Sequence, residues 1–483
     1  MKKLIKPLLI GIGAAALAAG AFFGARAVTL GAADSETEAA QAPSDQAAGA
    51  TLAEFSDYEL FSEVPRMAAA DARYERAVDD GAGTYGISVY GTTKADYDAY
   101  LSLLEADGYE RYADNGEGGL EGYVYKTYLQ KGVLRLSVTH ITALDLTRVT
   151  ACEGGVWPEH LRYEDSHIED NDASAKTTLY QGELYDVAMS FVIRLKNGRF
   201  IINDGGNDVD MPYLIEDLEA LTPDGEKPVV EAWFISHAHT DHMGVFKGFF
   251  EKKEYLDRIF VENVYFNDMS EEAEKYNNQF EKVTAMLNYV RGVPHMMTST
   301  DGTAPEIHEM STGDRYYFSD ITVDVIFSSE MMADYTKWGN QNGATTWLMY
   351  TIEGQKLLFS GDGTFDEQQA IMEIYDSAYF DLDFFTTPHH GYDVFDQFTD
   401  HFTGLKTVLY SNPLKWLAGS GMESGSSSHT VALKHLNDIS QESYAFGKGT
   451  VVFEFPYEVG TAVTMPEREW THNIMPPSWK WEE

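Results

Sequence analysis

The chain contains a single cysteine, Cys152, among its 483 residues. One cysteine forms no intramolecular disulfide and no paired-cysteine metal cluster, so a metal site in this chain has to use histidine and carboxylate ligands. Basic residues are also scarce, since 35 Lys and Arg stand against 77 Asp and Glu and the formal charge is 35 − 77 = −42. Because this charge repels nucleic-acid phosphates, the composition argues against a nucleic-acid-binding protein.

The N-terminus carries an apolar run of 18 residues, Leu8 to Ala25, after three lysines. Residues 1–27 are typical of an export signal with an A-x-A cleavage motif at positions 25–27, and the run is also long enough for a membrane anchor. Residues 28–55 are polar and Ala-rich without periodicity, which predicts a flexible linker. We therefore expect a protein that is secreted or anchored to the outer face of the cytoplasmic membrane, with this segment as its only membrane contact.

Two further regions differ in pattern. Residues 56–165 predict a small α+β domain of unknown role, with a strand at Gly86–Tyr90, a capping box at Thr93–Asp96 before a helix, and further strands at Tyr123–Tyr128 and Val133–Thr139. Residues 175–465 alternate between strands and helices and predict a layered α/β domain, and residues 466–483 form a C-terminal tail. The residues that carry chemistry lie in this layered domain.

Four side chains that bind metals fall within six positions, at His237–Ala238–His239–Thr240–Asp241–His242. They follow an apolar strand predicted at Val229–Ser236 and precede the start of a helix. Histidines two positions apart on an extended chain point the same way, and the Asp–His pair just beyond them faces a second ion. Packing gives no reason for such a cluster, so the motif predicts a two-metal site.

The motif resembles that of the metallo-β-lactamase superfamily, and the resemblance covers residues 177–456. Asp204, at the end of an apolar strand, is similar to an early Asp that orients the metal ligands. Gly361–Asp362 is similar to the segment whose carboxylate bridges both metals. Pro388–His389–His390–Gly391 is similar to the segment of the lactamase-like domain in DNA-uptake competence proteins, and its spacing from Asp362 is similar to that in phosphorylcholine esterase. The resemblance implies a four-layer αββα fold.

The resemblance also implies a role for each ligand. We expect His237 and His239 to bind the first metal, Asp241 and His242 to bind the second, and Asp362 to bridge them. We expect His389 to complete the second site, and His390 is the alternative for this role. If His389 is the ligand, His390 lies beside the ligands and supports them. Zinc suits a His-rich set best, and manganese or iron are alternatives because carboxylates are included.

The sequence departs from the lactamases in one place. Lactamases have a further histidine between the first motif and the segment that corresponds to Gly361–Asp362. Here Asn340, Gln341, Asn342 and Thr345 occupy that region, and the competence-type branch similarly carries Asn. His295 and His308 lie in the interval, but their surroundings do not match the motif, and we expect both on the surface. The missing histidine argues against β-lactam hydrolysis.

Four further residues are candidates to contact substrate or support the ligands: Asn342, Tyr392, Ser411 and His429. His429 is able to protonate a leaving group, because imidazole changes charge near neutral pH, although it also reads as a polar residue at a helix start. The Gly- and Ser-rich stretch Ala418–Ser428 is a candidate for substrate selection or a plain connection.

These residues predict an exported dinuclear hydrolase. Two divalent ions about 3.5–4 Å apart lower the pKa of a bridging water, and Asp241 or Asp362 orients the resulting hydroxide. Phosphate esters and diesters fit best, because two non-bridging oxygens reach one ion each, and the substrate would be a small molecule or a cell-wall phosphoester. The alternatives are hydrolysis of a carboxylic ester, lactone or amide, and a surface binding protein with a vestigial metal site.

Overall fold

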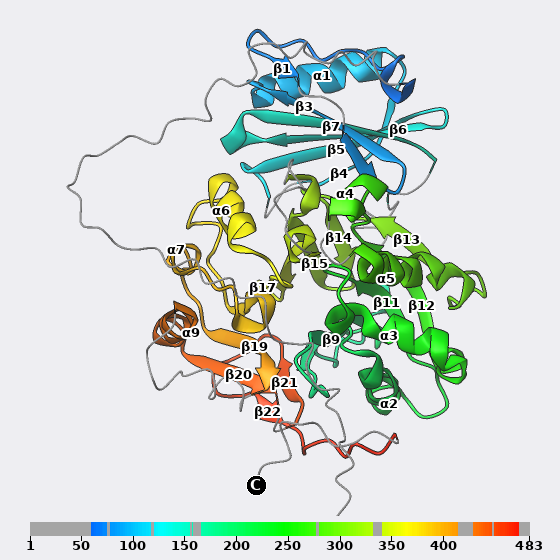
Figure 1. The fold of residues 1–483 in the computed structure, drawn as a ribbon, viewed down its shortest axis with the longest axis vertical. Coiled ribbons are helices and arrows are strands. Elements are labelled where there is room, and N and C mark those ends of the chain that lie inside the picture. The colour runs from blue at the N-terminus through cyan, green and yellow to red at the C-terminus, as the bar shows by residue number, and fades with distance from the viewer. Residues whose placement is uncertain are drawn as a thin grey trace, which may run out of the picture. The chain divides into compact units, whose positions relative to one another are not determined.

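The computed structural model describes residues 59–74, 78–116, 120–154, 157, 166–276, 280–331, 341–413, 428–446 and 449–472. The predicted export segment and linker, most of the stretch at 418–428 and the tail beyond residue 472 lie outside these ranges. The described residues belong to one compact unit (Figure 1). Among the described residues, no helix has both the length and the apolar character that crossing a membrane requires.

A seven-stranded sheet occupies residues 73–153. Its order is β1-β3-β7-β6-β5-β4, with β2 paired to β3, and its strands are antiparallel. The strands are β1 (Arg73–Tyr74), β2 (Val78–Gly81), β3 (Thr84–Tyr90), β4 (Glu110–Asp114), β5 (Val124–Lys131), β6 (Leu134–Ile141) and β7 (Leu146–Glu153).

Helix α1 (Lys94–Ala106) covers one face of this sheet, where Leu101 and Leu104 pack in one core with Val138. The predicted capping box is confirmed: Asp96 N donates to Thr93 Oγ1, and Thr93 N donates to the Asp96 carboxylate at 2.8 Å. These two bonds satisfy backbone groups that the first turn of a helix leaves without partners.

Two more sheets follow. The first has the order β13-β12-β11-β10-β9-β8-β21-β22, and the second has the order β14-β15-β16-β17-β18-β19-β20. The strands of the first are β8 (Thr178–Gln181), β9 (Ser190–Arg194), β10 (Phe200–Asp204), β11 (Val229–Phe234), β12 (Phe260–Phe266), β13 (Glu306–Glu309), β21 (Val451–Glu454) and β22 (Val463–Thr464). Those of the second are β14 (Arg315–Phe318), β15 (Ile321–Phe327), β16 (Trp347–Ile352), β17 (Gln355–Phe359), β18 (Phe384–Thr386), β19 (Thr407–Pro413) and β20 (Glu442–Phe446).

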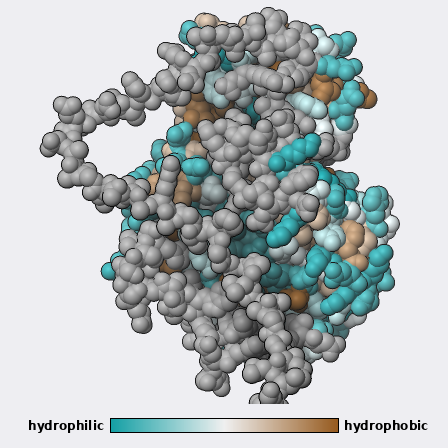
Figure 2. All heavy atoms as spheres, viewed as in Figure 1, coloured by the Kyte–Doolittle hydropathy of each residue, from teal (hydrophilic) through white to brown (hydrophobic). Residues whose placement is uncertain are grey.

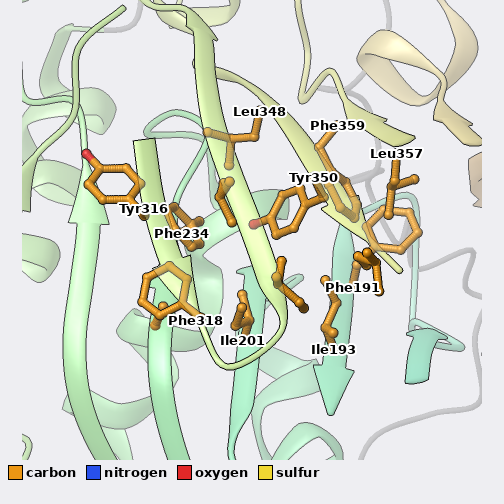
Figure 3. Close-up of a cluster of buried hydrophobic side chains, with 14 of the residues drawn as sticks. Phe191, Ile193, Ile201, Phe234, Tyr316, Phe318, Leu348, Tyr350, Leu357 and Phe359 are labelled. Carbon is orange, nitrogen blue, oxygen red and sulfur yellow. The ribbon is translucent and has the colours of Figure 1, made fainter. Parts of the chain in front are cut away.

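The two sheets pack face to face through one apolar core. Phe191, Ile201 and Phe234 of the first sheet lie in this core with Tyr350 and Phe359 of the second (Figure 3). Alternation along each strand places these side chains on the inner faces and leaves the neighbouring positions for the outer faces. The predicted strand at Val229–Ser236 is β11.

The outer faces carry the helices in two further cores. Helices α2 (Met211–Ala220), α3 (Thr240–Glu251) and α5 (Phe280–Gly292) cover the first sheet, and α4 (Glu271–Tyr276) precedes α5. Helices α6 (Phe365–Ile374), α7 (Asp396–Thr399) and α9 (Ser428–Ile439) cover the second sheet. Helix, sheet, sheet and helix thus form four layers, which confirms the predicted αββα architecture.

Figure 2 shows hydrophilic side chains interspersed with smaller hydrophobic patches among the described residues of the face that it draws. His308, which we expected on the surface, is buried instead. Its ring packs on Tyr265 with centroids 4.9 Å apart, and its Nε2 lies 2.8 Å from Asn263 Oδ1. A hydrogen-bonded partner on the neighbouring strand allows this polar ring to be buried at little cost.

A buried ion pair joins the sheet of residues 73–153 to the sandwich. Lys126 Nζ on β5 lies 2.8 Å from Asp314 Oδ1, and both side chains are almost fully buried. Asp314 also accepts hydrogen bonds from Tyr128 and Tyr316. A charge pair sealed from water with all its partners in place is costly to break, because the remaining charge is then buried alone.

Replacing Lys126→Ala should therefore lower the free energy of unfolding by about 3–5 kcal/mol, measured by urea denaturation. Lys131→Ala, on the same strand, is the matched control, because the Lys131–Asp107 pair is about two-fifths exposed at both ends. Exposed pairs contribute ~1 kcal/mol or less. Equal losses in the two variants would show that burial of the first pair does not matter.

Candidate metal centre

Six side chains form two groups that could hold metal ions. One group consists of Asp241, His242, Asp362 and His390, and the other of His237, His239 and Asp362. Within each group, one ligand atom per residue lies within 4.8 Å of the others. The described structure thus brings together the first motif and two segments more than a hundred residues downstream.

The ends of neighbouring strands deliver these ligands. His237 and His239 follow β11, and Asp241 and His242 lie in the first turn of α3. Asp362 follows β17, and His390 lies in the short 3₁₀ helix Pro388–Gly391 after β18. Side chains from both sheets therefore meet at one end of the sandwich, as expected for sites in layered α/β folds.

Asp362 belongs to both groups, and its two oxygens face different partners. Oδ1 lies 3.0 Å from His242 Nε2 and 3.4 Å from His390 Nε2. Oδ2 lies 3.7 Å from His237 Nε2. One oxygen toward each group is the arrangement that a bridging carboxylate requires.

Asp204 contacts the segment that carries the first motif. Its carboxylate accepts hydrogen bonds from Ser236 N at 2.8 Å and Ser236 Oγ at 2.9 Å, and it lies 2.8 Å from His242 Nδ1. With Nδ1–H donating to Asp204, His242 presents Nε2 to the site. His390 is fixed in the same way, since its Nδ1 lies 2.9 Å from the Ser411 carbonyl oxygen.

The atoms that point into the centre fit a bound cation. Within the described residues, four buried ligand atoms face other members of the two groups instead of hydrogen-bond partners elsewhere in the chain: His239 Nε2, His242 Nε2, His390 Nε2 and Asp362 Oδ1. Buried polar groups without partners are rare and costly in proteins, so their convergence at one point calls for a ligand. Imidazole nitrogens with carboxylate oxygens are a donor set for zinc and also for manganese or iron.

The charges of the site also suit a cation. Burial lowers the pKa values of His237 and His239, which keeps these imidazoles neutral with a lone pair available. Burial alone would raise the pKa of Asp362, but His242 and the two histidines at 389 and 390 lower it well below its ordinary value. For His242, burial is outweighed by Asp362 and Asp204, which raise its pKa.

The structure places His390, not His389, in the group with Asp241, His242 and Asp362. His389 Nε2 lies 3.8 Å from Asp362 Oδ2, and its Nδ1 is 2.5 Å from Asp393 Oδ2 at a partly exposed position. Both histidines have a left-handed backbone, with φ of 48° and 56°. A non-glycine residue pays about 1–2 kcal/mol for this conformation, so two in succession indicate a functional constraint.

The remaining candidates lie at varying distances from the ligands. Ser411 touches the site through its carbonyl, and the half-exposed Tyr392 ring lies 5.5 Å from that of His389. Asn342 is buried in the short 3₁₀ helix Gln341–Ala344 that precedes β16. His429 lies in the first turn of α9, and its side chain is outside the described part of the structure.

Sequence reasoning missed Ser236 and Asp393. Ser236 Oγ lies between Asp204 and His237 Nδ1, 3.0 Å from the latter, and so links the two. Asp393 orients His389 from four positions downstream. A polar residue directly before the motif and an acid four positions after a histidine were the available signals, but both patterns are common in proteins.

Comparison with models of known protein families finds no match for this chain, and comparison with curated proteins finds none either. Among solved structures, the chain is similar to a metallo-β-lactamase of Cronobacter sakazakii with a HARLDQ motif. The two are 14% identical, the alignment spans 52% of this chain and 83% of the lactamase, and the TM-score is 0.24. A subclass B3 metallo-β-lactamase of Bradyrhizobium japonicum is also 14% identical, covering 54% and 88%, with a TM-score of 0.24. A metallo-β-lactamase of Hirschia baltica is 11% identical, covering 59% and 70%, with a TM-score of 0.19. The four-layer fold is established by the packing of the chain itself.

The ligand assignment at 389 and 390 is open to a direct test. His390→Ala should lower the metal content of the purified protein, because it removes a nitrogen from the group that includes Asp241, His242 and Asp362. His389→Ala is the matched control and should keep the metal content of the unaltered protein. Elemental analysis of both variants decides the matter, and metal loss in the His389 variant alone would reverse the assignment.

A second test concerns Glu367, which caps α6 just after the Asp362 loop. Burial raises the pKa of Glu367 from its ordinary 4.5 to about 8, against hydrogen bonds from Thr364. The folded protein therefore holds this proton up to a higher pH than the unfolded chain does. Its stabilising effect is complete below pH ~4.5 and is lost as the pH rises toward 8, by at most about 1.4 kcal/mol per pH unit.

Glu367→Gln should flatten this loss when urea denaturation is compared at pH 5.5 and pH 8.5. Asp366→Asn, at the exposed neighbouring position, should leave the pH dependence as it is in the unaltered protein. The same slope in all three proteins would contradict the buried, protonated state of Glu367.

Proposed function

We propose that this protein is a metal-dependent hydrolase of the metallo-β-lactamase type that cleaves phosphate esters or phosphodiesters. The observation that carries the proposal is the Asp362 carboxylate, whose two oxygens face two groups of buried histidines. The ordered arrangement of the first motif, Asp204, Asp362 and His390 supports the same family of sites.

The donor set explains the choice of substrate. Two divalent ions would supply a nucleophile at neutral pH and neutralise negative charge that develops on the substrate. The carboxylates Asp241 and Asp362 repel anions by themselves. Bound ions would offset this repulsion, and the two non-bridging oxygens of a phosphate group match two ions.

The individual side chains have separate tasks in this proposal. Asp362 holds the two halves of the site together. Asp204 fixes the tautomer of His242, and the Ser411 carbonyl does the same for His390. His239, at the edge of the site, and Asp241 lie where the reacting group would enter, because both side chains are less enclosed than His237 and His242.

The wider proposal follows the sequence. Zinc is the metal that the His-rich set favours, and the apolar segment at 8–25 supports export, with a wall-linked or small phosphoester as substrate. Hydrolysis of a lactone or carboxylic ester is the competing activity, since the same ions would polarise a carbonyl. A binding protein with a vestigial centre is the competing class.

The direct test uses the full metal-loaded chain with bis(p-nitrophenyl) phosphate. The protein should contain about two ions per chain and release p-nitrophenolate, and Asp362→Ala should abolish turnover and lower metal content. Glu373→Gln, at an exposed acid of α6, is the control and should retain both. Turnover of a lactone alone would refute the phosphoester proposal. A protein that is fully folded but contains no metal would refute the proposal that it is an enzyme.

His429 needs a variant of its own. His429→Ala should keep about two ions and mainly slow the reaction if this residue protonates the leaving group. The slowing should be largest for poor leaving groups such as an alkoxide and small for p-nitrophenolate. Loss of metal in this variant would instead identify His429 as a ligand.

A further inference from the structure

Two aromatic side chains stand out on the surface beside the metal centre. Phe365 is 45% exposed and Tyr392 is 43% exposed, and they are the exposed aromatic residues within the described part of the chain. Soluble proteins bury most of their aromatic surface, so two exposed rings on neighbouring segments indicate a contact surface.

Both rings sit on segments that leave the ligands directly. Phe365 follows Asp362 by three positions, and Tyr392 follows His390 by two. The Tyr392 ring lies 5.5 Å from that of His389, whose Nε2 is 3.8 Å from Asp362. The Phe365 ring in turn packs edge-on against Phe395, with centroids 5.8 Å apart. We call Phe365, Tyr392 and Phe395 the aromatic patch.

The two segments are held together by the buried side chain of Gln368. Its Nε2 donates to Asp393 O at 2.6 Å, and its Oε1 accepts from Phe395 N at 3.0 Å. Gln368 therefore ties α6 to the chain that carries Tyr392 and Phe395. A surface fixed in this way binds a ligand without the entropy cost of ordering itself.

The charges around the patch restrict what it accepts. Asp366 is exposed next to Phe365, whereas the half-buried Asp393 after Tyr392 is paired with His389. The exposed Asp366 carboxylate repels a second anionic group beyond the phosphate that the metals would bind. The surroundings thus select for an apolar ring and against a charged polymer.

We propose that the aromatic patch binds an uncharged planar group on the substrate, on the ester side that is not cleaved. This inference rests on the proposed phosphodiesterase activity and narrows its substrates to diesters with one aromatic or similarly flat apolar substituent. Stacking and edge contacts between rings contribute about 0.5–1.5 kcal/mol each, which is a two- to tenfold preference.

The test compares diesters that share one leaving group. For p-nitrophenyl phenyl phosphate and p-nitrophenyl methyl phosphate, the ratio of kcat/KM values reports only the group that stays behind. Phe365→Ala and Tyr392→Ala should each lower this phenyl-to-methyl ratio two- to tenfold, and Tyr392→Phe should keep it. A p-nitrophenyl diester with a 4-carboxyphenyl group should lose most of the preference in the unaltered protein.

Leu103→Ala is the matched control, because Leu103 is also 43% exposed but belongs to α1 on the sheet of residues 73–153. Leu103→Ala should leave kcat/KM unchanged for both the phenyl and the methyl diester. An unchanged phenyl-to-methyl ratio in both aromatic variants would overturn the inference even with an active enzyme.

A binding measurement separates the inference from the proposed function. If the metal-loaded protein cleaves neither diester, the phosphodiesterase proposal fails, and calorimetry with phenylphosphonate and methylphosphonate then tests the patch alone. Tighter binding of phenylphosphonate that Tyr392→Ala abolishes would support the patch. Equal binding of the two phosphonates would overturn it.

Discussion

The buried carboxylate of Asp204 is the contact on which the centre depends. It accepts hydrogen bonds from Ser236 N and Ser236 Oγ and orients the ring of His242. One side chain therefore fixes both the backbone just before the first motif and the imidazole at the end of that motif. Asp204 itself has a left-handed backbone, with φ of 58°. The surrounding structure maintains this strain, because β10 is paired with β11 and the contacts with Ser236 and His242 hold the buried carboxylate.

The first motif and the pattern of apolar strands made it predictable that the ligand residues meet at one place. Apolar runs that end at metal-binding residues predict convergence, because strand ends meet at one edge of a sheet. The position of His390 was not predictable, since it depends on the backbone handedness at two successive residues rather than on residue type. Buried pairs such as Lys126–Asp314 were also out of reach, because they join segments 188 residues apart that no local pattern connects.

A tight backbone approach adds a constraint that residue types do not show. A Cβ atom at Gly361 would lie 2.7 Å from Thr345 Cγ2 and 2.8 Å from Ser236 Cβ, and its φ of 46° disfavours side chains in any case. The loop that carries Asp362 is therefore pressed onto the segment that carries His237. This close approach lets a single carboxylate reach ligands from both sheets.

The shared position of Asp362 has a consequence for how the fold responds to heat. The ligands of each group come from both sheets of the sandwich, so bound ions would tie the two sheets together at the strand ends that carry the ligands. Binding to the folded state alone adds RT ln(1 + [M]/Kd) to its stability, about 2.7 kcal/mol at a hundredfold excess over Kd. Metal supply in the surroundings would then decide not only whether the protein is active but also how long it stays folded.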